Sequence, residues 1–102
     1  MIRHIVLFKL KEFSSEAERN DVLEKVLINF RSLKGEISYI RFYKVEKDIF
    51  GGMDSYDVVI DSNFDSIEDL KAYQNHPAHQ YAVEQNKKWC DHKAVMDYEL
   101  LD

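Results

Sequence analysis

Residues 2–10 read IRHIVLFKL, and both alternating faces of this stretch carry apolar side chains. β-branched and aromatic residues at such spacing are typical of a β-strand. A strand with one face in water would alternate apolar and polar residues, so the pattern predicts a central strand that is buried on both sides. One face holds Ile2, His4, Val6 and Phe8, and the other holds Ile5 and Leu7.

A helix is predicted to follow this strand. Ser15 and Glu18 form a capping box, and apolar residues then recur at helical spacing until Gly35, which is expected to end the helix. These apolar positions are Leu23, Val26, Leu27, Phe30 and Leu33.

The rest of the chain alternates in the same way between strand and helix patterns. Strands are predicted over residues 37–45 and 56–61, joined by a hairpin connection at Gly51-Gly52. A second helix is predicted over residues 66–74. Pro77 suits the first position of a third helical segment, with apolar spacing through Trp89, and residues 92–101 are predicted to form the last strand.

The resulting order, β-α-β-β-α with a helical extension and then β, predicts an α+β fold of the ferredoxin-like type with one four-stranded antiparallel sheet. Residues 1–102 are expected to form a single domain. The helices can cover only one face of this sheet, although its first and last strands carry apolar groups on both. Monomers rarely expose such a patch, so we expect a homodimer packed sheet to sheet.

The net charge and the cysteine content limit the expected binding partners and the expected cellular compartment of the protein. The formal net charge is −5 and no run of five or six like charges occurs, which argues against nucleic acid and anionic membrane surfaces as partners. Cys90 is the single cysteine, so no intramolecular disulfide is expected. No signal or membrane-spanning stretch is apparent, and a cytoplasmic location is expected.

The sequence His76-Pro77-Ala78-His79 places two imidazoles around a proline, with Tyr73 shortly before it. Together with His4 and Asp97, these residues could do acid/base chemistry, or they could only hold the fold together. His76 precedes a proline and is expected to cap the next helix, although it is also a candidate for substrate contact. His79 and Asp97 form either a buried structural pair or a proton-transfer pair.

An apolar cavity beside these groups is expected to be lined by Ile60, Phe64 and Tyr81. Neither an HExxH motif nor paired cysteines occur, and no phosphate loop or nucleophile elbow is present. The sequence therefore predicts no metal site and no cofactor.

Four segments resemble the stress-responsive dimeric α/β barrel (Dabb) family: MIRHIVLFKLK at residues 1–11, the helix up to Tyr73, HPAHQ at 76–80 and MDYEL at 96–100. The resemblance implies a protomer whose sheet pairs with a second copy to form a barrel. One plant member performs a cofactor-free aldol cyclisation of a polyketide. Related dimeric α/β barrels include haem-degrading enzymes and cofactor-free monooxygenases, so haem is an alternative ligand by fold analogy alone. By this resemblance His79 is the general base, Asp97 orients it, and Tyr73 and His4 hold substrate carbonyls.

Three hypotheses follow. The chain is a cofactor-free enzyme, a lyase or cyclase or a monooxygenase-like protein, that acts on a small hydrophobic carbonyl compound. Alternatively, it is a stress-related module that binds a small hydrophobic ligand without catalysis. In the third hypothesis it is a structural homodimer whose polar cluster only specifies the fold. An enclosed pocket lined by the four polar groups would favour the first two.

Overall fold

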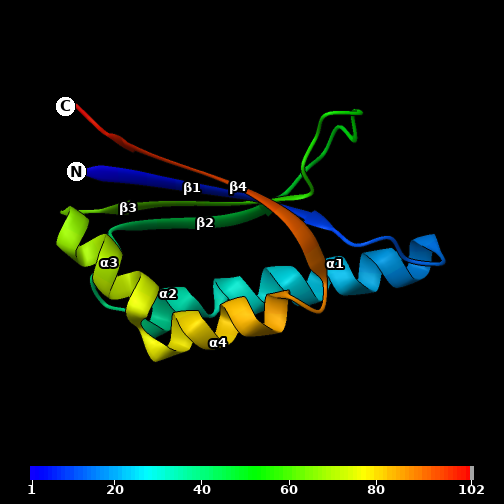
Figure 1. Cartoon of the computed structure of the whole chain (residues 1–102), viewed down its shortest axis with the longest axis horizontal. Coiled ribbons are helices and arrows are strands. Elements are labelled where there is room, and N and C mark those ends of the chain that lie inside the picture. Colours follow the sequence, from blue (N-terminus) through cyan, green and yellow to red (C-terminus); the bar gives the residue numbers. More distant parts are fainter. Residues whose placement is uncertain (102) are drawn as a thin grey trace.

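The computed structural model of the chain describes residues 1–101 and shows a four-stranded antiparallel sheet with every helix packed on one of its faces (Figure 1). The predicted ferredoxin-like order of elements is confirmed. The elements are β1 (Ile2–Leu10), α1 (Glu16–Arg31), α2 (Leu33–Glu36), β2 (Phe42–Lys47), β3 (Val58–Phe64), α3 (Ile67–Asn75), α4 (Pro77–Asn86) and β4 (Cys90–Glu99).

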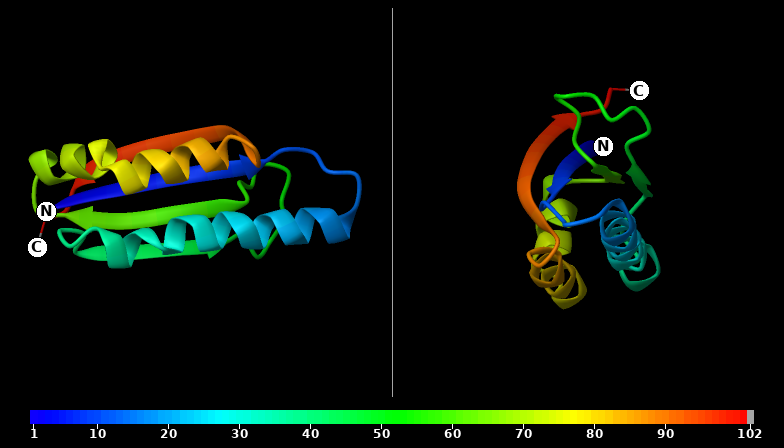
Figure 2. Two further views of the ribbon diagram at one scale, coloured as in Figure 1. Left: turned by 90° about the horizontal axis from the view of Figure 1, so that it is seen from below. Right: turned by 90° about the vertical axis from the view of Figure 1, so that its right-hand side faces the viewer.

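The strands lie in the order β2-β3-β1-β4, so β1 is central, as its two apolar faces predict. It pairs antiparallel with both β3 and β4, and Val6 lies opposite Ile60 on one side and Val95 on the other. Figure 2 shows α1 beneath the β2 edge of the sheet and α4 beneath the β4 edge. At its start, β4 bends toward α4 (Figure 1).

The core lies between the sheet and the helices. Every second residue of β1, from His4 to Leu10, is buried on this side, and Val26, Leu27 and Phe30 of α1 pack against it. The rings of Phe8 and Phe30 stack with centroids 5.3 Å apart. Burying each such side chain contributes roughly 1.5–3 kcal/mol to stability.

The opposite face of the sheet, which we call the open face, has no helix over it in the described part of the chain. Cross-strand register places Phe42, Val59, Ile5, Leu7, Met96 and Tyr98 on this face. Met96 is 65% exposed, and Tyr98 is also exposed. The open face thus carries these apolar side chains together with the Arg3–Asp61 ion pair, and its β4 side chains Met96 and Tyr98 are accessible in the protomer.

The first helix ends at a different residue from the predicted one. Its start is as expected, because the Ser15 hydroxyl accepts the Glu18 N–H at 3.1 Å. It breaks at Ser32 and resumes as α2, so Gly35 lies inside a helix instead of ending one. The Ser32 hydroxyl donates to the Asn29 carbonyl at 2.8 Å, a local bond that competes with helix continuation.

Several other element boundaries in the structure differ from the predicted ones by a few residues. β2 begins only at Phe42, because Ile37 and Ile40 turn inward and are buried in the core instead of joining the predicted strand. Asp57 belongs to the loop before β3, where its carboxylate accepts the Leu10 N–H at 2.8 Å. Gly51 has a φ of 72°, as the predicted connection requires.

At the C-terminal end, α4 is shorter than predicted. It ends at Asn86, and the Trp89 N–H donates to the Asn86 carbonyl at 3.0 Å in the turn that follows. This turn lets β4 begin at Cys90, two residues earlier than predicted.

Candidate active site

His76 forms the junction between α3 and α4. Its backbone is extended, which Pro77 after it favours, and its Nδ1 accepts the Ala78 N–H at 3.0 Å. The predicted capping role is confirmed. The ring is held at the helix start and does not line the cavity described below, which corrects the prediction that His76 contacts substrate.

His79 lies in the first turn of α4, and its Nδ1 is 3.1 Å from the Gln74 carbonyl oxygen. A carbonyl can only accept, so Nδ1 carries the proton and the neutral ring keeps its lone pair on Nε2. Burial lowers the pKa of His79, and although the Gln74 carbonyl opposes this, the positive charges of His4, Lys93 and His76 lower it further. His79 is therefore a neutral imidazole at neutral pH.

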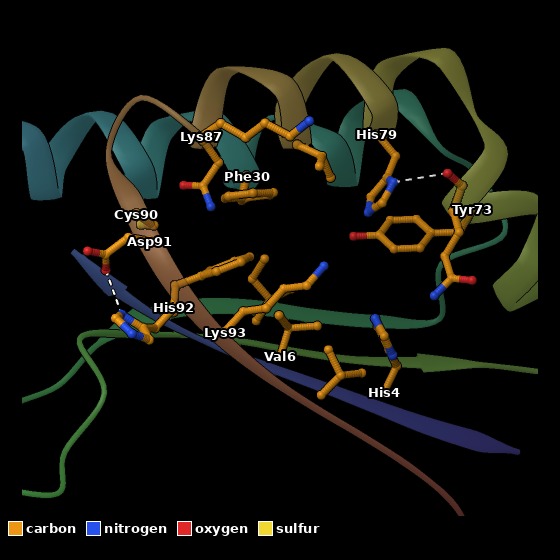
Figure 3. Close-up of a pocket in the computed structure, with 16 residues that line it drawn as sticks. His4, Val6, Phe30, Tyr73, His79, Lys87, Cys90, Asp91, His92 and Lys93 are labelled. Carbon is orange, nitrogen blue, oxygen red and sulfur yellow. Dashed lines mark hydrogen bonds and ion pairs between the residues drawn. The ribbon is translucent and has the colours of Figure 1, made fainter. Parts of the chain in front are cut away.

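His4 is held by Asp97. The two residues are cross-strand partners on β1 and β4, and His4 Nδ1 forms a hydrogen bond with the Asp97 carboxylate. The His4 side chain is buried on the helix side of the sheet, and Figure 3 shows its ring directed toward Tyr73. This corrects the expected pairing of Asp97 with His79: strand register fixes Asp97 beside His4, whereas His79 lies on a helix and bonds to Gln74.

Tyr73, in α3, lies between the two histidines. Its ring is 4.4 Å from that of His79 and 6.3 Å from that of His4, measured between centroids. Only 1% of the residue is exposed. Burial raises the pKa of Tyr73 to about 12, an effect that the Tyr43 hydroxyl opposes only in part, so the phenol stays a hydrogen-bond donor at neutral pH.

A cavity of about 310 Å³ opens beside these groups, between the β1 and β4 strands and helices α3 and α4 (Figure 3). This volume is at the lower end of small-molecule sites. His4, Tyr73 and His79 meet at one end of it. The other lining residues are Val6, Phe8, Phe30, Ile60, Gln74, Val83, Asn86, Lys87, Cys90, Asp91, His92, Lys93 and Val95.

Of the three predicted apolar lining residues, only Ile60 reaches the cavity. Phe64 is fully buried behind the site, with its ring 5.0 Å from that of Tyr73, so it supports Tyr73 instead of facing a ligand. Tyr81 is 66% exposed because it lies on the outer face of α4. The structure thus corrects the expected roles of Phe64 and Tyr81.

The sequence analysis missed several further residues that line the cavity. Asn86 is buried, and its Oδ1 has no hydrogen-bond partner in the described part of the chain. Burial raises the pKa of Cys90 to about 12, so its sulfur stays a thiol and is a poor nucleophile. Lys93 lies opposite Phe8 in the β1–β4 pairing, and a correct register for the last strand would have placed it on the cavity side.

Residues 1–101 contain no group of three or more histidine, cysteine, aspartate or glutamate residues placed to hold a metal ion. None of the helices in this range is long and apolar enough to span a membrane.

Comparison with known proteins gives a consistent result. The family model described as the Stress responsive A/B Barrel Domain (Dabb) matches residues 2–100. An uncharacterized protein of Streptomyces coelicolor is 42% identical over 83 residues, which are 81% of this chain and 84% of that protein.

Solved structures with the same fold include a dimeric protein of unknown function from Bacteroides fragilis. It has a ferredoxin-like fold, a TM-score of 0.85 and 30% identity, with 97% of this chain and 95% of that chain covered. A hydroxynitrile lyase from Passiflora edulis has a TM-score of 0.80 at 17% identity, with 99% and 94% covered. At that identity the likeness shows a shared fold and nothing finer.

Proposed function

This chain belongs to the stress-responsive A/B barrel domain (Dabb) family, and we propose that it is an enzyme that uses its own side chains for acid/base chemistry on a small hydrophobic carbonyl compound. The proposed reaction begins with removal of a proton from the carbon next to the carbonyl. Enolisation, cyclisation and lyase reactions share this step. The relatives matched by this chain include an uncharacterized protein and a protein of unknown function, so the proposal rests on the site itself.

The main support for the proposal is the protonation and hydrogen bonding of His79. Its Nδ1–H is used by the Gln74 carbonyl, and burial keeps the ring neutral, so Nε2 is free to accept a proton beside the cavity. A general base needs both properties: the unprotonated form at working pH and a lone pair directed at the substrate.

The other two groups at this end suit the same step. As His79 Nε2 takes the proton, negative charge moves to the substrate carbonyl oxygen, and the neutral Tyr73 phenol can donate a hydrogen bond to it. His4, whose ring orientation is fixed by Asp97, can contact a second polar group of the substrate. A later return of the proton from His79 would restore the starting state.

We further propose that the working form is a homodimer joined through the open face. An exposed apolar sheet face is uncommon in monomers, and the Bacteroides fragilis structure with 30% identity is described as dimeric. A cytoplasmic location is part of the same proposal and agrees with Cys90, a free buried thiol.

A binding module without catalysis is the second candidate function. Part of the cavity wall favours it, because six of the sixteen lining residues are aliphatic or phenylalanine side chains: Val6, Phe8, Phe30, Ile60, Val83 and Val95. Such a pocket could hold a small hydrophobic ligand with no proton transfer.

Deuterium uptake distinguishes the two functions. A panel of small ketones and β-diketones is incubated with the protein in deuterated buffer, and exchange at the carbon next to the carbonyl is followed by NMR. The wild-type protein should accelerate exchange for some members, and His79→Gln should lower this rate by about a hundredfold or more with little change in thermal stability. Added imidazole should partly restore exchange in His79→Ala.

One outcome of this experiment would contradict the catalytic proposal. Binding of panel members without exchange, equal for the wild type and for His79→Gln, would overturn the catalytic proposal and leave the binding module.

A further inference from the structure

We propose that the ligand of this cavity is an organic anion, with the Lys93 ammonium as the counter-charge for its carboxylate. This proposal rests on the proposed function. Taken together, the two proposals define the substrate as a small carbonyl compound that also carries a carboxylate. The chain itself has a net charge of −5, so the preference would come from one local side chain against the overall charge of the protein.

The position of Lys93 on β4 directs it to the cavity. It is the cross-strand partner of Phe8, whose side chain is buried on the helix side of the sheet, and paired residues share a face. Figure 3 shows the Lys93 side chain extending along the cavity, with its amino group directed toward the end that holds Tyr73 and His79.

The charge of Lys93 is uncompensated within residues 1–101. The other lining lysine, Lys87, forms an ion pair with Glu84 at 3.0 Å, whereas Lys93 has no carboxylate within 4.0 Å.

The carboxylates nearby are already engaged. Asp91 contacts His92 Nδ1 at 2.8 Å, and Asp97 is bonded to His4. Both of these carboxylates bond to histidines, and neither lies within 4.0 Å of Lys93, so the Lys93 ammonium has no direct ion-pair partner among the described residues. Lys93 itself is exposed, so an anion would meet its ammonium where the cavity opens to water, while the apolar walls hold the carbon chain of the ligand.

An anion at Lys93 would also act on the proposed base. The positive charge of Lys93 is one of the influences that lower the pKa of His79. A bound carboxylate would offset that charge, so the pKa of His79 should rise when the anion binds. Binding would thereby make the imidazole a stronger base only when a substrate is present.

The test uses a matched pair of inert probes, hexanoate and hexanamide, which differ in charge but not in carbon skeleton. Calorimetry should show that the wild-type protein binds hexanoate about tenfold more tightly than hexanamide, as expected for a hydrogen bond to a charged group. Lys93→Met should remove this difference. NMR of the His79 ring should show its titration moving to higher pH with hexanoate and not with hexanamide.

Lys88→Met is the matched control. It removes the same charge nearby, but Lys88 bonds to Gln85 at 2.7 Å and does not line the cavity, so the preference for hexanoate should persist. Equal affinity for the two probes, no binding of either, or an equal effect of Lys88→Met would overturn the proposal.

These outcomes are independent of catalysis, because neither probe is turned over. A wild-type protein that prefers hexanoate through Lys93 but never accelerates deuterium exchange would retain the anion site and lose the enzyme.

Discussion

His4 and Asp97 lie directly opposite each other on β1 and β4, and their side chains form a hydrogen bond on the cavity side of the sheet. His79, by contrast, is held by the uncharged Gln74 carbonyl. His4 and His79 therefore have hydrogen-bond partners of different charge. Asp97 fixes the orientation of the His4 ring, whereas burial, and to a smaller extent neighbouring positive charges, lowers the pKa of His79. This difference suits His79 to the role of base.

Asp97→Asn should change His4 and leave His79 as it is. Loss of the carboxylate weakens a partly exposed charge-assisted bond, so we expect the free energy of unfolding to fall by about 1 kcal/mol. Nitrogen shifts of the two rings should show that His4 loses its fixed tautomer while His79 stays protonated on Nδ1. A tautomer change at His79 would mean that Asp97 acts on it after all.

The pH dependence of the reaction should reflect the lowered pKa of His79. The usual histidine value is 6.5, so the base is already neutral above this pH, and kcat/KM should be flat there. The rate should fall only under more acidic conditions, as the ring takes up a proton. A rate that rises steadily between pH 6.5 and 8 would assign the base to another group.

The free energy of unfolding should also depend on the protonation of His79. The unfolded chain protonates His79 at a higher pH than the folded chain does, so the neutral ring gives its full contribution above about pH 6.5. This contribution is lost as the pH falls toward the lowered folded-state value. Urea unfolding at several pH values should therefore show the wild type losing more stability across this window than His79→Gln, which has no such group.

The fold could be predicted from the sequence because its signals are local. The apolar faces of residues 2–10, the capping box at Ser15 and the proline after His76 each specify an element or a boundary within a few residues. Predicted element boundaries were wrong where tertiary contacts determine the structure. Ile37 fits a strand pattern in the sequence, but its side chain is buried in the core and the residue lies outside the strand.

The site could be predicted only in part, for a related reason. His4, Tyr73 and His79 do come together, but their bonds depend on the β1–β4 register, which a sequence pattern leaves open. A shift of that register by one residue would turn Lys93 to the open face and separate Asp97 from His4. Hence the pairing of Asp97 and the position of Lys93 emerged only with the structure.

Tyr73→Phe should separate catalysis from packing. The ring remains between Phe64 and His79, so the free energy of unfolding should change by about 1 kcal/mol or less. The proton-transfer rate should fall by about a hundredfold, because the donor to the substrate oxygen is lost.

Tyr43→Phe provides the comparison, since the Tyr43 hydroxyl donates to the Phe30 carbonyl at 2.9 Å and does not line the cavity. It should cost stability, about 1 kcal/mol, with a much smaller loss of rate. Similar rates for the two variants would remove Tyr73 from the proposed mechanism.

Met96→Glu should break the proposed dimer without unfolding the protomer. Met96 is 65% exposed on the open face, so a glutamate there meets water in the isolated protomer but a desolvated apolar surface in a sheet-to-sheet dimer. Ile28→Glu is the matched control, because Ile28 on α1 is also 65% exposed but lies on the helix side. Sedimentation should give a dimer for the wild type and Ile28→Glu, and a monomer for Met96→Glu. If Met96→Glu stays dimeric, the interface cannot be centred on this strand, and the open face loses the role proposed for it.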